Sequence, residues 1–212
     1  MSLAADYSAV NDRAVNSIVI KYGGNAIAGA TDADALAQFA HDVVQLHADG
    51  LQPVVVHGGG PQISELMAQR GKQPEFRGGL RVTDAETIDI VRSALMEHVN
   101  PQLVAAINAQ SPLAVGMSGE DLIDASARDP ELGFVGDVAA IDASVLRDLL
   151  DKGLIPVVAP LGVDADGQPY NINADTVAGA IAAALGAQRL VYLTDIEGLR
   201  RDVSDATSLI RD

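Results

Sequence analysis

Residues 17–24 have the sequence SIVIKYGG and residues 53–60 the sequence PVVVHGGG, so two runs rich in β-branched residues each end in glycines. Both runs have the length and composition of buried strands, and a helical pattern follows each of them. Strands that alternate with helices are typical of a parallel sheet covered by helices. The sequence therefore predicts an α/β fold, a three-layer α/β/α sandwich around a mostly parallel open sheet. Further strands are expected at 113–117, 154–159 and 189–194, and helices at 31–50, 61–71, 84–99, 142–153 and 176–185.

Three local features refine this outline. Asn100-Pro101 is expected to break the helix after Val99 and to restart a short one, because proline lacks the backbone N–H that a helix needs. Residues 118–137 are polar and punctuated by Gly and Pro, which indicates a loop or a hairpin. Thr83 or Asp84 is expected to cap the helix that runs through Val99, and Asp175 is expected to cap the last helix.

The composition excludes several classes of protein. The 212 residues carry 14 Lys+Arg against 29 Asp+Glu, a net charge of −15, so neither a nucleic acid nor an anionic membrane is an expected partner. The chain has no Cys, which rules out disulfides, thiolate metal sites and a thiol nucleophile. No apolar run approaches the length of a membrane span and the first residues do not resemble a signal peptide, so we expect a cytoplasmic protein.

The two glycine clusters are the first candidates for a binding site. Glycine lets the backbone approach a ligand and turn its N–H groups toward an anion, and a following helix adds the positive end of its dipole. Neither cluster matches the dinucleotide fingerprint or a Walker A loop. They are either tight strand-to-helix turns or a less common cradle for phosphate or carboxylate.

Two cations stand near these glycines. The period of two along the first strand places Ile18, Ile20 and Tyr22 on one face and Lys21 on the other. Lys21 then either extends to the surface or reaches the crevice at the carboxyl ends of the strands, where open α/β sheets bind ligands. Arg81 follows two glycines and precedes a helix, so it is either an exposed loop residue or a fork for a carboxylate.

The segment YNINADTVAG (170–179) offers three polar side chains two residues apart, Asn171, Asn173 and Asp175. In an extended chain all three point to one face. The alternative is that the asparagines are turn residues and that the aspartate is only a helix cap. The four histidines show no metal-ligand spacing, so no metal ligands are predicted in the protein.

Seven segments together resemble the amino acid kinase family, in family order across nearly the whole chain. The resemblance is strongest to the branch of arginine biosynthesis whose acceptor is N-acetyl-L-glutamate. The segments are IVIKYGGNAI (18–27), VVVHGGGPQISELM (54–67), GGLRVTD (78–84), GDVAAIDASVL (136–146), IPVVAPLG (155–162), YNINADTVAGAIAAALGA (170–187) and YLTDIEGL (192–199).

The resemblance implies a kinase that uses ATP with Mg²⁺ to convert the acceptor's side-chain carboxylate into an acyl phosphate. By resemblance, Lys21 stabilises charge on the transferring phosphoryl group and Asp175 orients that lysine. The implied acceptor site comprises Gly59, Gly60, Arg81, Asn171 and Asn173, with Arg81 on the α-carboxylate. The implied ATP site comprises Gly23, Gly24, Thr194, Asp195, Ile196, Glu197, Gly198, Leu199 and Arg200.

The resemblance also implies an organisation. We expect an N-terminal extension (1–16), an acetylglutamate-binding lobe (17–170) and the start of a nucleotide-binding lobe (171–212). The family continues for several dozen residues with a second lysine, so this chain is expected to be cut short. A homodimer is expected, with a hexamer as the alternative. A kinase for aminoadipate, aspartate or carbamate, or a silent substrate-binding or regulatory module, remains open.

Overall fold

A five-stranded parallel sheet forms the centre of the molecule. The computed structural model describes residues 16–23, 33–194, 198, 200–202, 205 and 207–210. Every neighbouring pair in this sheet is parallel, which confirms the predicted fold class. In spatial order the strands are β11 (Arg189–Leu193), β1 (Ser17–Tyr22), β2 (Gln52–His57), β8 (Ile155–Ala159) and β5 (Ala114–Ser118).

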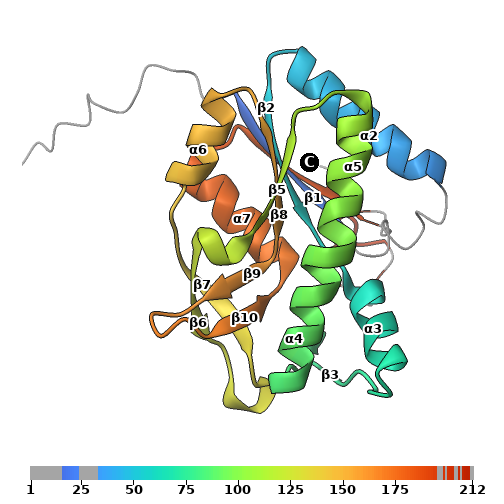
Figure 1. The fold of residues 1–212 in the computed structure, drawn as a ribbon, viewed down its shortest axis with the longest axis vertical. Coiled ribbons are helices and arrows are strands. Elements are labelled where there is room, and N and C mark those ends of the chain that lie inside the picture. Colours follow the sequence, from blue (N-terminus) through green and yellow to red (C-terminus); the bar gives the residue numbers. More distant parts are fainter. Residues whose placement is uncertain are drawn as a thin grey trace, which may run out of the picture.

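Helices cover both faces of this sheet (Figure 1). One face packs on α2 (Ala33–Ala48) and α5 (Asn100–Gln110), and the other packs on α6 (Ser144–Asp151) and α7 (Ala174–Leu185). Ile18, Ile20 and Tyr22 lie in the α2–α5 core, whereas Val19 lies in the α6–α7 core. The predicted alternation along β1 is confirmed, and it places Lys21 on the α7 side.

A second, closed sheet lies below the central one and was not predicted. It joins β6 (Ile123–Ala127), β7 (Val135–Ile141), β9 (Leu161–Val163) and β10 (Pro169–Ile172) into a small barrel. Residues 118–137 therefore contribute a strand and part of its antiparallel partner, besides two 3₁₀ turns at Gly119–Asp121 and Pro130–Leu132. The hairpin interpretation of this stretch is right and the loop interpretation is wrong. In β6 only Ile123 and Ala125 face the core, too short an alternation to stand out among polar neighbours.

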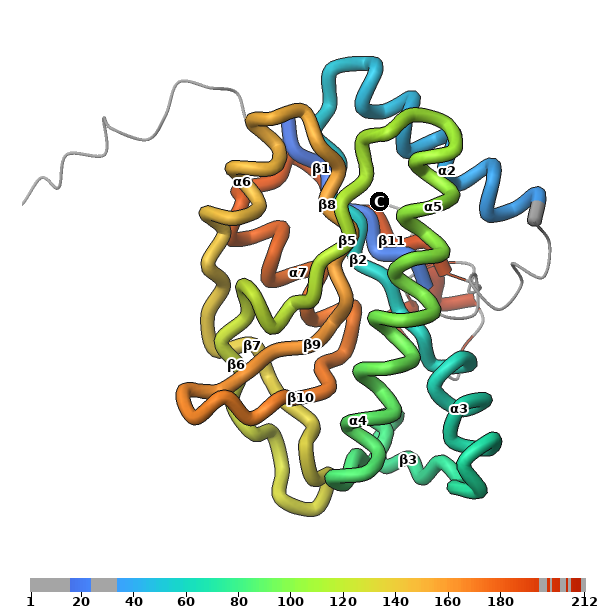
Figure 2. Tube along the Cα trace, in the orientation of Figure 1, coloured from blue at the N-terminus to red at the C-terminus, as the bar shows by residue number. Residues whose placement is uncertain are grey.

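One long helical rod covers a face of the sheet with its second half and extends beyond the sheet with its first half. It comprises α4 (Ala85–Ser93), a π-helical turn (Ala94–Val99) and α5, drawn in green in Figures 1 and 2. The predicted break at Asn100-Pro101 is wrong. A π-helical turn carries one extra residue, and the Asn100 N–H donates to the Leu95 carbonyl instead of the usual fourth residue back. This wider turn lets the chain continue through a proline.

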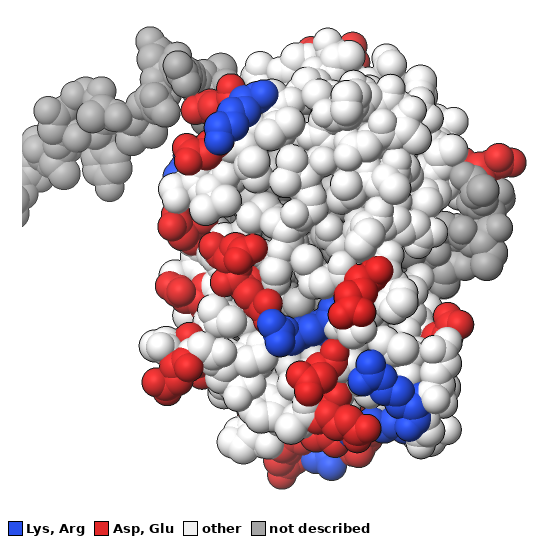
Figure 3. All heavy atoms as spheres, viewed as in Figure 1, with Lys and Arg blue, Asp and Glu red and all other residues white. Residues whose placement is uncertain are grey.

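The remaining elements lie at the lower end of the rod. They are α3 (Gly60–Gln69) and the two-stranded hairpin of β3 (Phe76–Arg77) and β4 (Leu80–Arg81). Acidic side chains outnumber basic ones on the face shown in Figure 3, in the half that holds the small barrel and α4. Among the described residues, no helix is both long and apolar enough to cross a membrane.

Helix caps confirm one prediction and correct another. The Asp84 carboxylate accepts the Thr87 N–H at 2.8 Å and caps α4 as predicted. The predicted cap of α7 by Asp175 is wrong, because the Asn173 side chain accepts the N–H groups of Asp175 and Thr176 at 2.8 and 3.2 Å. Asp175 therefore lies inside the first turn, and its carboxylate stays available for another partner.

Candidate functional site

The carboxyl ends of β1 and β2 meet beneath a cavity. Tyr22 and His57 are opposite each other in the sheet, and the Gly58 N–H donates to the Tyr22 carbonyl at 2.9 Å. Both glycine clusters therefore begin at the same sheet edge, where parallel α/β sheets bind ligands. The cavity has a volume of about 300 Å³. Nine predicted site residues line it: Lys21, Gly23, Gly59, Gly60, Arg81, Asn171, Asn173, Asp175 and Thr194.

A lysine–aspartate pair stands on one wall of the cavity. Lys21 Nζ lies 2.9 Å from Asp175 Oδ1, and the lysine side chain is only 13% exposed whereas the aspartate is 54% exposed. The pair joins the end of β1 to the first turn of α7. A lysine held in this way presents a fixed positive charge to the cavity, and its three donors let it contact an anion as well.

Close packing requires glycine at two of the positions that line the cavity, Gly23 and Gly59, but not at Gly60. A Cβ at Gly23 would stand 2.7 Å from the Leu193 carbonyl oxygen, and a Cβ at Gly59 would overlap the Leu95 side chain. A Cβ at Gly60 would meet no protein atom within 4 Å. Gly60 begins α3 with Pro61 in the next position, so the first N–H groups of that helix have no acceptor within it. This helix start can hold a phosphate or a carboxylate.

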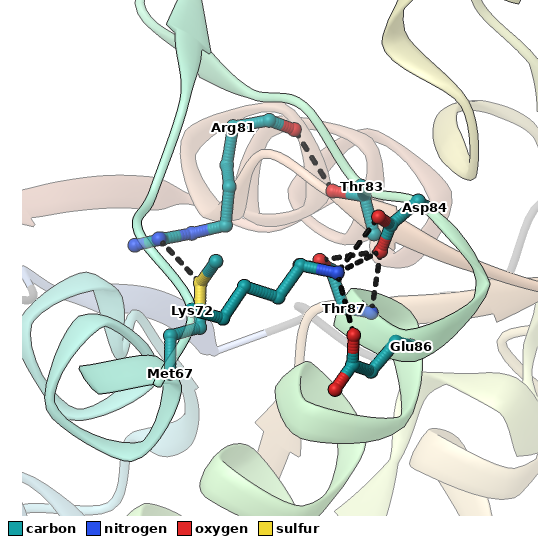
Figure 4. A network of polar contacts seen from close by, with 7 residues as sticks. All are labelled: Met67, Lys72, Arg81, Thr83, Asp84, Glu86 and Thr87. Carbon is teal, nitrogen blue, oxygen red and sulfur yellow. Dashed lines mark hydrogen bonds and ion pairs between the residues drawn. The ribbon is translucent and has the colours of Figure 1, made fainter. Parts of the chain in front are cut away.

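A buried arginine also lines the cavity, and Figure 4 shows its guanidinium next to the Met67 sulfur. Arg81 is 7% exposed, and its guanidinium donates to the Gly60 carbonyl (3.0 Å), Ser64 Oγ (2.8 Å) and Met67 Sδ (3.1 Å). The guanidinium also lies over the Phe76 ring, 4.7 Å from the centroid. Among the described residues, no carboxylate forms an ion pair with it, and burial lowers its pKa. A buried cation without an anion is costly, so this site favours an anionic ligand.

Near Arg81, Lys72 forms a cluster with Asp84 and Glu86 that holds the loop carrying the arginine. Lys72 Nζ donates to both carboxylate oxygens of Asp84 at 2.7 Å and to Glu86 at 3.0 Å (Figure 4). Hydrogen bonds from Lys72 and Thr87 lower the pKa of Asp84 to about 2. The carboxylates in turn raise the pKa of Lys72. The loop is therefore anchored to α3 through Arg81 and to the start of α4 through Asp84.

The two asparagines play different structural parts. Asn171 belongs to β10 and donates from Nδ2 to the buried Thr83 Oγ1 at 3.3 Å, and Thr83 in turn donates to the Arg81 carbonyl at 2.8 Å. Asn171 is thus connected to the arginine loop. Asn173 uses its side-chain oxygen to cap α7, which leaves only its amide hydrogens for a ligand.

The predicted nucleotide segment is only partly placed. Thr194 lines the cavity, whereas Gly198 and Arg200 are described but do not line it. Arg200 instead forms an antiparallel bridge with Leu209. The remaining members of the predicted ATP site lie outside the described residues: Gly24, Asp195, Ile196, Glu197 and Leu199.

Sequence reasoning missed Phe76 and Ser64, which both contact Arg81. Phe76 is 54% exposed at the cavity rim, an unusual place for a large apolar residue. Ser64 follows Gly60 by four residues and so lies on the same face of α3, a spacing that could have been noticed. Within the described ranges, no three His, Asp or Glu side chains are grouped to hold a metal ion.

Comparisons with known proteins show the family and the fold. A sequence model of the amino acid kinase family matches residues 16–211. Acetylglutamate kinase from Corynebacterium glutamicum is 50% identical over 202 residues, which cover 91% of this chain and 68% of the relative. Acetylglutamate kinase from Symbiobacterium thermophilum is 50% identical, with 92% and 69% covered. The crystal structure of smu.665 from Streptococcus mutans superposes with a TM-score of 0.78 at 31% identity, with 88% and 76% covered. The chain thus spans about two thirds of the two kinases' length.

Proposed function

The chain belongs to the amino acid kinase family, and from that membership we propose that it transfers the γ-phosphoryl group of ATP to the side-chain carboxylate of N-acetyl-L-glutamate. One observation carries the proposal. A single cavity joins the Lys21–Asp175 pair, the start of α3 and a buried arginine that pairs with no carboxylate of the described residues. These groups suit a reaction between two anions, in which a protein must supply position and positive charge.

The acceptor occupies the wall formed by Arg81 and Asn171. Toward the described residues the guanidinium uses three of its five N–H groups, which leaves two for the α-carboxylate. Asn171 and the amide hydrogens of Asn173 supply further donors for the acceptor. Apolar neighbours such as Ile63 and Leu95 surround the space between these polar groups.

The phosphoryl group occupies the wall formed by the glycines and Lys21. An oxygen of the acceptor's side-chain carboxylate forms a bond to the γ-phosphorus while the bond from that phosphorus to the bridging oxygen of ADP breaks. The products are an acyl phosphate and ADP. Lys21 balances the charge on the transferring group while Asp175 holds its ammonium in place. Gly59 and Gly60 direct N–H groups toward the same charge, and Gly23 approaches the nucleotide phosphates. Mg²⁺ enters with ATP as part of that substrate.

Several finer points belong to the same proposal. Residues 17–170 would bind the acceptor, and 171–212 would begin the nucleotide-binding lobe, where Thr194 and the segment through Arg200 would meet ATP. We place the protein in the cytoplasm, as a homodimer or a larger homo-oligomer. None of these assignments alters the chemistry at Lys21 and Arg81.

An acceptor panel tests the proposal. The chain is incubated with Mg·ATP, hydroxylamine and one acid at a time: N-acetyl-L-glutamate, L-aspartate, L-2-aminoadipate or carbamate. Hydroxylamine traps an acyl phosphate as a hydroxamate, which forms a coloured complex with iron(III). We expect hydroxamate with N-acetyl-L-glutamate and at most a tenth as much with the other acids. A higher rate with another acid would reassign the acceptor. Calorimetric binding of N-acetyl-L-glutamate without any ADP would indicate a silent binding module instead.

A further inference from the structure

The π-helical turn Ala94–Val99 lies against the glycine loop 58–60 and has no role in the proposed reaction so far. Leu95 is fully buried, lines the cavity and fills the space where Gly59 would carry a side chain. Val99 lies 3.5 Å from that same position. π-Helical turns within α-helices often occur at functional sites, because the extra residue redirects the side chains that follow.

The residue that follows this turn, Asn100, reaches back to the sheet beneath the loop. Its Nδ2 lies 3.1 Å from His57 Nε2 and 2.9 Å from the Val157 carbonyl oxygen. Both hydrogens of this buried amide are therefore used, one on each acceptor. The backbone N–H of Asn100 closes the π turn on the Leu95 carbonyl, while its side chain contacts β2 and β8.

His57 continues the chain of hydrogen bonds to the loop itself. It is completely buried, and its Nδ1 lies 2.8 Å from the Gly58 carbonyl oxygen. A carbonyl can only accept, so Nδ1 carries the proton and Nε2 accepts from Asn100. Burial lowers the pKa of His57 to about 4, so the ring stays neutral near pH 7. The Gly58 carbonyl belongs to the same peptide unit as the Gly59 N–H.

We propose that His57 and Asn100 are positioning residues, which fix the peptide between Gly58 and Gly59 so that the loop's N–H groups face the transferring phosphoryl group. The proposal rests on the function proposed above. The hydrogen bond from Nδ1 sets the tilt of that peptide, and Asn100 holds the ring in the tautomer that can donate. The Leu95 side chain packs against Gly59 of the same loop.

Two substitutions of His57 separate positioning from simple packing. In His57→Asn the side-chain amide nitrogen falls near the place of Nδ1, so it can still donate to Gly58, but the smaller side chain leaves a void. In His57→Gln the amide reaches the place of Nε2 and can still contact Asn100, but Gly58 loses its donor. We expect His57→Asn to have the lower melting temperature and yet the higher kcat of the two.

The expected changes in kcat follow from the loss of well-aligned hydrogen-bond donors. His57→Gln should lower kcat about ten- to a hundredfold while the KM for N-acetyl-L-glutamate stays within about threefold, because donors aimed at developing charge act mainly on the rate. Asn100→Leu should behave in the same way. The matched control is Asn108→Leu in the same helix, where Asn108 makes two hydrogen bonds with Ala114. This control should lower stability but leave kcat unchanged. If kcat merely follows the melting temperatures across the four variants, the positioning role is refuted.

A second readout does not depend on turnover. The backbone amide signals of Gly59 and Gly60 are assigned by ¹H–¹⁵N NMR in the wild type and in both His57 variants. We expect a larger displacement of these signals in His57→Gln than in His57→Asn. Equal displacements would overturn the proposal. If the wild type releases no ADP, the kinase proposal fails by itself, and these amide signals still decide whether His57 orients the loop.

Discussion

Replacing Arg81 by methionine should separate ligand binding from folding. Methionine keeps much of the side-chain length and removes the charge. If Arg81 holds the acceptor's α-carboxylate, the substitution removes charge-assisted hydrogen bonds worth about 3 kcal/mol in total. Because 1.4 kcal/mol corresponds to a factor of ten, the dissociation constant for N-acetyl-L-glutamate should rise on the order of a hundredfold.

Isothermal titration calorimetry of N-acetyl-L-glutamate measures this change without requiring turnover. Arg77→Met is the matched control, since Arg77 lies in the same hairpin but is half exposed and pairs with Glu75 and Glu131. This control should bind the acceptor within about twofold of the wild type. Thermal unfolding of both variants shows whether they are folded. An Arg81→Met protein that is folded and still binds within threefold of the wild type would refute the assigned role.

Three further predictions concern the glycine wall and its surroundings. Lys21→Met should lower kcat about a hundredfold or more in a coupled ADP assay with little change in acceptor affinity, because its charge acts mainly in the transition state; an equal loss in affinity would contradict this. Gly59→Ala should lower both the melting temperature and kcat, since its Cβ would overlap Leu95. Gly60→Ala should keep the melting temperature of the wild type and lose only activity, since its Cβ would meet no protein atom within 4 Å. His57, with a pKa of about 4 when folded against 6.5 when unfolded, takes up its proton more readily in the unfolded chain. Stability from this residue is therefore complete above pH 6.5 and falls by about 3 kcal/mol toward pH 4; denaturant unfolding of His57→Gln across this range should show a shallower fall.

The central sheet could be predicted from the sequence because each strand is a short β-branched run. In β1 the alternation of Ile18 and Ile20 with Val19 shows directly that helices cover both faces. Gly50 and Gly153, at φ +87° and +71°, end helices where the sequence places them. These signals are local, so the sequence alone reveals them.

The errors arose where distant contacts override local preference. Pro101 should end a helix, because it has no N–H to donate. The π-helical turn before it lets the helix continue without that hydrogen bond, and contacts with the glycine loop hold this turn in place. Asp175 and Asn173 are both good caps, and the ion pair between Lys21 and Asp175 accompanies the cap at Asn173. The small barrel depends on pairing between β6 and β7 and between β9 and β10. Its strands have only three to seven residues, and the sequence of one such short strand does not indicate its partner.

The candidate site was predicted as a set of residues but not as a network. Lys21, the glycines and Arg81 stood out because charge and glycine at strand ends are unusual. Phe76, Ser64 and the pair of His57 and Asn100 did not stand out, since their parts come from contacts across the fold.

The most direct test of the central claim is ADP release by this 212-residue chain with Mg·ATP, measured with and without N-acetyl-L-glutamate while the acyl phosphate is trapped as hydroxamate. The proposed chemistry predicts ADP release that requires N-acetyl-L-glutamate and equals the hydroxamate formed, mole for mole. ADP release that ignores the acceptor, or hydroxamate that never forms although the acceptor binds, would contradict it.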